Sequence, residues 1–197
     1  QACTGLTKVV ILDGVTSIGD STFNGCTGLT SVVIPGSVTS IGSGAFRSCA
    51  GLESIVIPGS VTSIGSGAFR SCAGLESIVV EEGNPVYHSA GNCLIETQSK
   101  TLLFGCSNSI IPDDGSVTSI GDMAFKGHSG LTSIVIPESV ISIGGNAFSD
   151  CALQSVVFEN PEGWRDSWGN EISSEDLSDP ASAAWILSGS NGINRID

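Results

Sequence analysis

The sequence repeats itself every 23 residues, and this period limits what the chain can fold into. Residues 38–49 recur without a change as residues 61–72. A period of about 20–50 residues is the signature of a solenoid, in which single coils are too small to bury an apolar face and are stabilised by stacking. The columns that keep the register are phenylalanine (Phe23, Phe46, Phe69, Phe125, Phe148), cysteine (Cys3, Cys26, Cys49, Cys72, Cys151) and leucine (Leu6, Leu29, Leu52, Leu75, Leu131).

One unit reads Leu-x-x-(Val/Ile)-x-Ile-Pro-x-x-Val-x-x-Ile-Gly-x-x-Ala-Phe-x-x-Cys. Its length lies within the range of about 20–29 residues of leucine-rich repeats, in which each coil gives one strand to a parallel sheet. In residues 29–34 we expect that strand, with Leu29, Val32 and Ile34 facing inward. Pro35 ends it, because proline has no N–H to donate.

The rest of each unit returns the chain to the next strand. Residues 38–41 predict a second, short extended run on the opposite side of the coil. Gly42 is expected to turn the chain through a positive φ, and Phe46 and Cys49 to lie in a tight turn after it. The fold class is therefore an α/β-type repeat solenoid, mostly β: a right-handed leucine-rich-repeat solenoid with a parallel concave sheet.

This pattern resembles the BspA-like, or treponemal-type, leucine-rich repeats, whose consensus is met almost letter for letter at residues 52–72. The resemblance covers residues 1 to about 158. It implies a secreted or envelope-attached protein of host-associated bacteria, and of some protozoa, with a link to adhesion to host proteins.

The register breaks once within the repeats. Leu75 and Leu131 are 56 residues apart, which is 33 more than one unit. Residues 93–96 and 101–104 predict a β-hairpin around a polar turn. We take residues 81–113 as one elongated coil, of a kind that the BspA-like family also contains. Two interpretations stay open: a protruding recognition element, or an elaborated coil without a partner.

We divide the chain into a solenoid, residues 1–158, and a C-terminal capping segment, residues 159–197. Asp179 as an N-cap and Pro180 at the first helical position predict a short helix there. The three tryptophans of the chain also fall in this segment (Trp164, Trp168, Trp185). Covering the last coil explains them better than an aromatic ligand site does.

The net charge is −13, from 7 basic and 20 acidic residues. This excess disfavours nucleic acid and anionic membrane surfaces as partners, since both attract clustered Lys and Arg. No apolar run approaches the roughly 18–20 residues of a membrane-spanning helix, so we expect no membrane insertion.

Few residues have the chemistry of an active site. A 23-residue period stacks the cysteines in a line, whereas zinc needs four converging ligands, so we expect a ladder of packed thiols without metal. Cys93 and Cys106 bracket the hairpin and could form a disulfide, although their registers look offset. His128 takes a cysteine position and reads as a packing residue. His88 and Cys93 lack a third, orienting group. We expect no catalytic residue, no cofactor and no metal.

The outward positions of the sheet are the candidate binding site. They form columns of hydroxyls, two central glutamates and a valine stripe, which strand propensity alone would also explain. Aromatic residues are absent, which disfavours carbohydrate and leaves a protein or peptide partner. The candidate residues are Thr30, Ser31, Val33, Glu53, Ser54, Val56, Glu76, Ser77, Val79, Thr132, Ser133 and Val135.

The function expected is protein–protein binding by an extracellular or cell-surface protein, with adhesion to a host extracellular-matrix or surface protein as its finer form. The alternative is a structural spacer that displays another domain and has no ligand of its own. An enzyme using His88 and Cys93 is the third and weakest hypothesis. Gln1 falls partway through a unit, so we also expect preceding repeats or a cap, or self-association at the exposed first strand.

Overall fold

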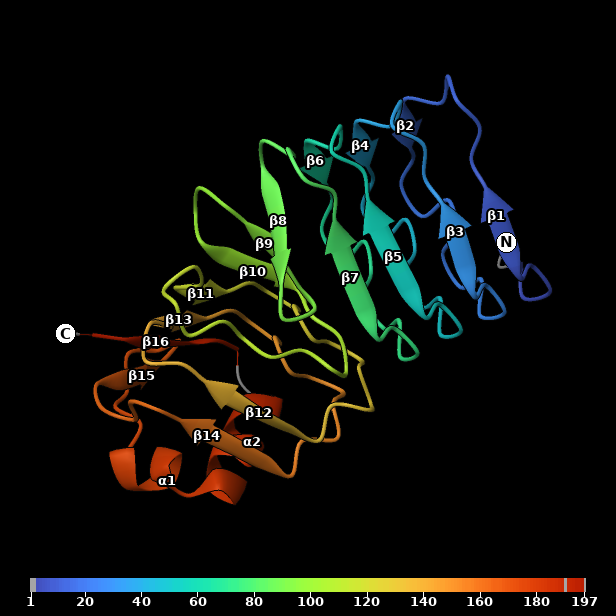
Figure 1. Ribbon diagram of the computed structural model, residues 1–197. Helices are drawn as coiled ribbons and strands as arrows, with labels where there is room; N and C mark the ends of the chain where they lie inside the picture. Colours follow the sequence, from blue (N-terminus) through green and yellow to red (C-terminus); the bar gives the residue numbers. More distant parts are fainter. Residues whose placement is uncertain (1–2, 190, 197) are drawn as a thin grey trace.

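The computed structural model describes residues 3–189 and 191–196 and is a leucine-rich-repeat solenoid of stacked coils (Figure 1). The main strands lie on a shared face and pair in parallel in twos at the spacing of the repeat, as Val56 does with Val79. These main strands are β1 (Lys8–Val10), β3 (Ser31–Val33), β5 (Ser54–Ile57), β7 (Ser77–Val80), β12 (Ser133–Ile136) and β14 (Ser155–Phe158). The expected fold class is confirmed.

Two-residue strands close the opposite side of the coils in two separate ladders. One contains β2 (Ser17–Ile18), β4 (Ser40–Ile41) and β6 (Ser63–Ile64), and the other includes β11 (Ser119–Ile120) and β13 (Ser142–Ile143). The run predicted at residues 38–41 is thus confirmed at its last two residues. Ile41 and its counterparts point into the core, which the main strands fill from the other side with alternate residues such as Ile55 and Ile57.

Phenylalanine rings stack along the core, but not in one column. Phe46 lies between Phe23 and Phe69, with ring centroids 5.3 and 5.6 Å apart. Phe125 and Phe148 form a second stack at 4.9 Å. Phe104 of the elongated coil extends the first stack, since it meets Phe69 edge-on at 5.5 Å. The 23-residue spacing did not reveal Phe104, because it arrives in a different register.

Gly42, which follows the short strand, is required for a different reason from the expected positive φ. Positive φ angles occur at Gly44 and at Ser48, not at Gly42. A Cβ on Gly42 would lie 2.5 Å from the amide nitrogen of Asp20 in the preceding coil. This glycine is therefore required because the backbones of stacked coils approach each other too closely for a side chain.

The elongated coil holds three antiparallel strands, β8 (Tyr87–Ala90), β9 (Cys93–Glu96) and β10 (Thr101–Phe104). The predicted hairpin is confirmed as β9 and β10, while β8 was not expected. The hairpin does not protrude: Cys93, Leu94 and Ile95 are all buried. Leu94 belongs to the N-terminal core cluster and Ile95 to the C-terminal one, so β9 divides the interior into two parts.

Asn84 fixes the start of this elongated coil. Its side-chain nitrogen donates to the carbonyl oxygens of Pro58 and Val61, and its side-chain oxygen accepts from the N–H groups of Val86 and Tyr87. The Tyr87 hydroxyl then accepts a hydrogen bond from the N–H of Ile64, 3.1 Å away. These contacts attach β8 to the coil before it.

The last coil is followed by β15 (Trp164–Asp166), α1 (Ser174–Ser178), α2 (Pro180–Gly189) and β16 (Ile193–Arg195). The helix expected at Pro180 is present, and Asp179 accepts a hydrogen bond from the N–H of Ser182 as its N-cap. Only Trp164 packs against the solenoid, edge-on to Phe158 at 5.2 Å. Trp168 and Trp185 are 76% and 79% exposed, so the expectation that three tryptophans cover the end was wrong for two of them.

Candidate binding surface

The outward side of the main strands forms a surface that we call the valine face. Each of them ends its outward row with a valine, and these valines are between 44% and 54% exposed. The six residues are Val10, Val33, Val56, Val79, Val135 and Val157. An apolar side chain that stays half in solvent at the same position of six strands forms a stripe and not a scatter of single exposed residues.

The polar candidates lie beside this stripe. Thr30, Glu53, Ser54 and Glu76 are exposed, and Ser77 is half-buried. The parallel register brings equivalent positions next to each other, with Ser54 opposite Ser77. In the C-terminal half Thr132 and Ser133 are exposed, and Ser31 in the N-terminal half is half-buried. The arrangement presents hydroxyls and carboxylates along one side of the valines.

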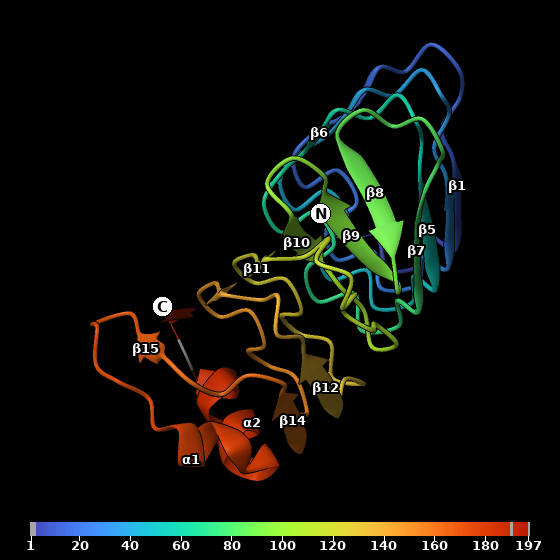
Figure 2. The same ribbon diagram turned by 60° about the vertical axis from the view of Figure 1, so that its left-hand side comes forward.

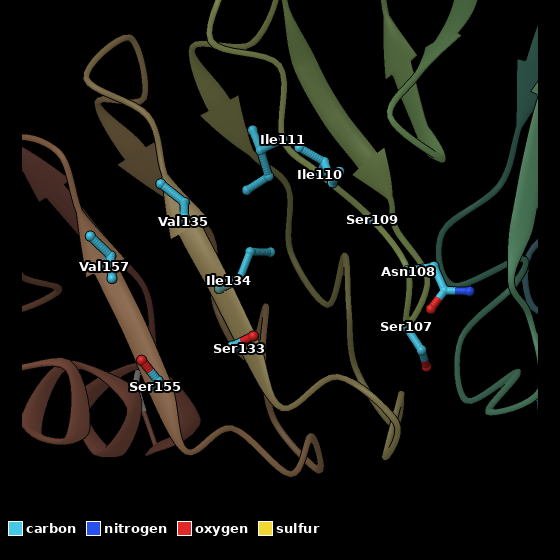
Figure 3. Close-up of a pocket in the computed structure, with 10 residues that line it drawn as sticks. All are labelled: Ser107, Asn108, Ser109, Ile110, Ile111, Ser133, Ile134, Val135, Ser155 and Val157. Atoms are coloured by element: carbon cyan, nitrogen blue, oxygen red, sulfur yellow. The ribbon is translucent and has the colours of Figure 1, made fainter.

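The valine face is interrupted, which the sequence analysis missed. Five residues separate Cys106 from Pro112, whereas eight separate Cys49 from Pro58. The shortened segment, residues 107–111, forms no strand. Between it and β12 lies a hollow of about 550 Å³, lined by Ile110, Val135 and Val157 among others (Figure 3). The expected sheet is therefore interrupted: its strands pair as β1 with β3, β5 with β7 and β12 with β14. The clear gap lies between β7 and β12, which stand apart in both views (Figure 1 and Figure 2), and the signal for it was the missing three residues.

Cys26, Cys49, Cys72 and Cys151 stand in the expected column, and none of them forms a disulfide. The Sγ of Cys49 donates to the carbonyl oxygen of Phe23, and that of Cys151 to Phe125. Burial raises the pKa of Cys49 to about 11 and that of Cys72 to about 12, so both stay protonated near neutral pH. Among the residues that the structure describes, no three His, Cys, Asp or Glu side chains gather as metal ligands would.

His88 and Cys93 do not form a reactive pair. The hairpin register sets His88 opposite Ile95 and Cys93 opposite Ala90. The Nδ1 of His88 lies 2.9 Å from Thr97 Oγ1, while the Sγ of Cys93 contacts the carbonyl oxygen of Gly91. Burial raises the pKa of Cys93 to about 12, which suppresses the thiolate that a nucleophile needs. Cys93 and Cys106 are not bridged.

His128 takes the cysteine position of its coil and is buried, as expected. Its Nδ1 has no hydrogen-bond partner, and burial lowers the pKa of the ring to about 4. A buried imidazole with this pKa is neutral at pH 7. The residue thus packs as an uncharged ring.

Within residues 3–189 and 191–196, no helix combines the length and the apolar character needed to cross a bilayer. A search of curated proteins finds no matching sequence. Among solved structures, the chain is similar to a leucine-rich cell surface protein of Faecalibacterium prausnitzii A2-165, with 37% identity and a TM-score of 0.67 over 77% of this chain and 41% of that one. It is also similar to the pneumococcal vaccine antigen PcpA, with 25% identity and a TM-score of 0.66 over 77% of this chain and 39% of that one.

The chain thus spans about two fifths of the length of these two proteins. The family model of the BspA-type leucine-rich-repeat region matches residues 1–114 and 104–164, in six copies. That match takes in every main strand of the valine face, and it agrees with the coils, the columns and the elongated unit described above. The chain belongs to the BspA-type leucine-rich-repeat family.

Proposed function

We propose that this chain is a binding module of an extracellular or cell-surface protein, that it takes a protein partner on the valine face, and that it catalyses no reaction. The observation that carries the proposal is the valine stripe, which keeps nearly the same exposure on six strands. Strand propensity favours valine at such positions, but it does not require the outward position two residues earlier to be polar on all six strands, as it is at Lys8, Ser31, Ser54, Ser77, Ser133 and Ser155.

The chemistry of the face supports a protein partner over a sugar. Val33, Val56 and Val79 provide an apolar band, and Glu53 and Glu76 provide exposed carboxylates beside it. An apolar centre with a polar rim is the usual composition of a protein interface. Aromatic rings, on which sugars stack, are absent from these columns.

The surface location is proposed from the relatives. The F. prausnitzii protein is described as a cell surface protein and PcpA as a vaccine antigen. Adhesion is the finer part of the proposal, with host extracellular-matrix proteins as the candidate partners. The alternative function is a spacer without a ligand, and the following experiment distinguishes it from a binding module.

The test is surface plasmon resonance against immobilised fibronectin, laminin, collagen and fibrinogen. The variant Val33→Lys/Val56→Lys/Val79→Lys should weaken binding about tenfold or more, because it places three cations in the apolar band. The matched control Thr16→Lys/Thr39→Lys/Thr62→Lys adds the same charge at exposed positions beside the short strands. It should retain the affinity of the wild type.

Two results would contradict the proposal. Equal loss in both triple variants would mean that net charge, and not the valine face, governs binding. Absence of binding by the wild type to every protein on the panel would favour the spacer.

A further inference from the structure

The gap in the valine face leaves one strand edge without a partner. β12 pairs with β14 in parallel, and no backbone hydrogen bond within the described part of the chain joins residues 107–113 to β12. The shortened segment bonds elsewhere. The N–H of Ile110 donates to the carbonyl oxygen of Gly91, and the side-chain nitrogen of Asn92 donates to the carbonyl oxygen of Asn108.

The direction of the backbone groups of β12 follows from its paired side. The carbonyl oxygens of Thr132 and Ile136 accept from the N–H groups of Gln154 and Glu159, so both point toward β14. Alternate residues of a strand point to opposite edges. Ser133 and Val135 therefore direct their N–H and C=O groups into the gap, where the preceding coil supplies no strand to receive them.

The other side of the gap is not equivalent. The edge of β7 is covered by β8, and the N–H of Val80 donates to the Oγ of Ser89 at 2.9 Å. The edge of β12 is thus the one that offers an open ladder. Unpaired strand edges of this kind bind extended peptides in many proteins.

The walls of the gap are apolar. Ile110 is 75% exposed, the highest value for an isoleucine in the described residues, and it faces the hollow together with Val135 and Val157 (Figure 3). The Oγ of Ser107, on the same wall, is buried and has no hydrogen-bond partner. The hollow therefore combines an apolar surface with polar groups that are left unpaired.

Exposed carboxylates stand in the sequence next to the ends of the strands on both sides of the gap and directly after the shortened segment: Glu76, Glu81, Glu82, Asp113, Asp114, Glu138 and Glu159. Two of them accept backbone hydrogen bonds, Glu81 from Gly59 and Glu159 from Glu138. The basic groups nearby are fewer. Lys100 donates to the carbonyl oxygen of Gly115, and Arg195 donates to that of Glu138. Hydrogen bonds from Ser116 lower the pKa of the Asp114 carboxyl group, and the nearby His88 lowers it further. The carboxylates next to these strand ends attract a cationic ligand.

We propose that an extended, basic segment of a partner protein adds as a strand to the open edge of β12. Its backbone pairs with Ser133 and Val135, its apolar side chains cover Ile110 and Val135, and its Lys or Arg side chains meet the carboxylates next to the strand ends. The inference rests on the proposed function, since it names the partner class and the place on the same face.

The probe is a fluorescein-labelled peptide Lys-Val-Lys-Val-Lys-Val-Lys, with Glu-Val-Glu-Val-Glu-Val-Glu as its matched control. Fluorescence anisotropy should show binding of the first peptide at least about tenfold tighter than that of the second. Amide hydrogen exchange by NMR should show that the lysine peptide slows exchange at Ser133 and Val135. Val79, whose position is already paired in the ladder of β5 and β7, should not change.

Two exposed residues give matched variants. Ile110→Lys places a cation in the gap and should weaken binding of the lysine peptide about tenfold, whereas Leu12→Lys, at a residue 71% exposed after β1, should leave it unchanged. Both substitutions are at the surface, so circular dichroism and thermal unfolding should match the wild type.

Failure of this inference is distinguishable from failure of the proposed function. Peptide binding lost in Val33→Lys/Val56→Lys but kept in Ile110→Lys would overturn the inference and support the valine stripe. Peptide binding at β12 with no response to the matrix panel would support the inference alone. The inference would also be overturned if the lysine peptide did not bind. A dimer in sedimentation that Ile110→Lys dissociates would overturn it as well, because a second copy of the chain would then occupy the gap.

Discussion

The Sγ of Cys72 donates a hydrogen bond to the carbonyl oxygen of Phe46, 26 residues earlier, over 3.1 Å. Cys49 makes the same bond to Phe23, also at 3.1 Å. Each bond joins one coil to the coil before it. The cysteine column is thus more than a column of small apolar residues, because a thiol satisfies a buried carbonyl group that an alanine would leave with one partner fewer.

Thiol reactivity should separate the buried column from the exposed end of the chain. Burial raises the pKa of Cys72 and of Cys93 to about 12, so their thiolate fraction at pH 8 is negligible. In native protein we expect Cys3, which is exposed, to react first with an aromatic disulfide reagent. All seven should react after unfolding. Stoichiometric zinc, or fewer than five titratable thiols, would contradict a reduced, metal-free ladder.

Spacing alone predicted those parts of the structure in which each coil repeats its neighbour. The columns of Phe46 and Cys49 follow from stacking, since equal positions in successive coils must meet. The helix at Pro180 follows from local capping chemistry. Phe104, which packs against Phe69, has no counterpart one unit away, so the repeat period does not predict its position.

Other features needed three-dimensional information of a different kind. The period identified Gly42 as obligatory, but it does not distinguish a positive φ from a close backbone contact with Asp20. The gap beside β12 corresponds to three missing residues in the sequence, yet Ile111-Pro112 repeats the Ile-Pro ending of the main strands, as in Ile57-Pro58. Which tryptophans pack depends on the path of the chain after Phe158, and that path follows no repeat.

Phe69→Ala should destabilise the fold by about 3–5 kcal/mol, since it removes a ring that is fully buried between Phe46 and Phe104. Phe23→Ala should cost clearly less, because that ring is half-buried at the end of the stack. Urea unfolding followed by circular dichroism measures both. An equal loss of unfolding free energy in both variants would contradict a greater packing contribution from the ring inside the stack.

Gly65→Ala should destabilise the chain by about 1–3 kcal/mol or more, the usual cost of overpacking. An added Cβ would lie 2.4 Å from the amide nitrogen of Ser43, so two coils would have to separate. Gly36→Ala is the control, because nothing lies within 4 Å of its added Cβ. Thermal unfolding should place Gly36→Ala at the wild-type value. A Gly65→Ala variant with the same midpoint would refute the close approach of the coils.

Acid should weaken the fold through His128. Burial lowers the pKa of its ring from 6.5 to about 4, so between these values the unfolded chain binds a proton that the folded chain does not. Stability is then complete above about pH 6.5 and falls as the pH drops toward 4, by about 2 kcal/mol at pH 5 from this residue. His128→Cys restores the column residue and removes the effect. Urea unfolding of both proteins at pH 7 and pH 5 should show the wild type losing more; equal losses would mean that His128 titrates normally.

Hydrogen–deuterium exchange on this chain bound to a matrix protein that it recognises would map the binding surface without altering a residue. Binding by the valine face should slow exchange in the peptides that carry β3, β5, β7 and β12 and leave the short strands β4 and β6 unchanged. Protection confined to α1 and α2, or to the short strands, would contradict binding by the valine face.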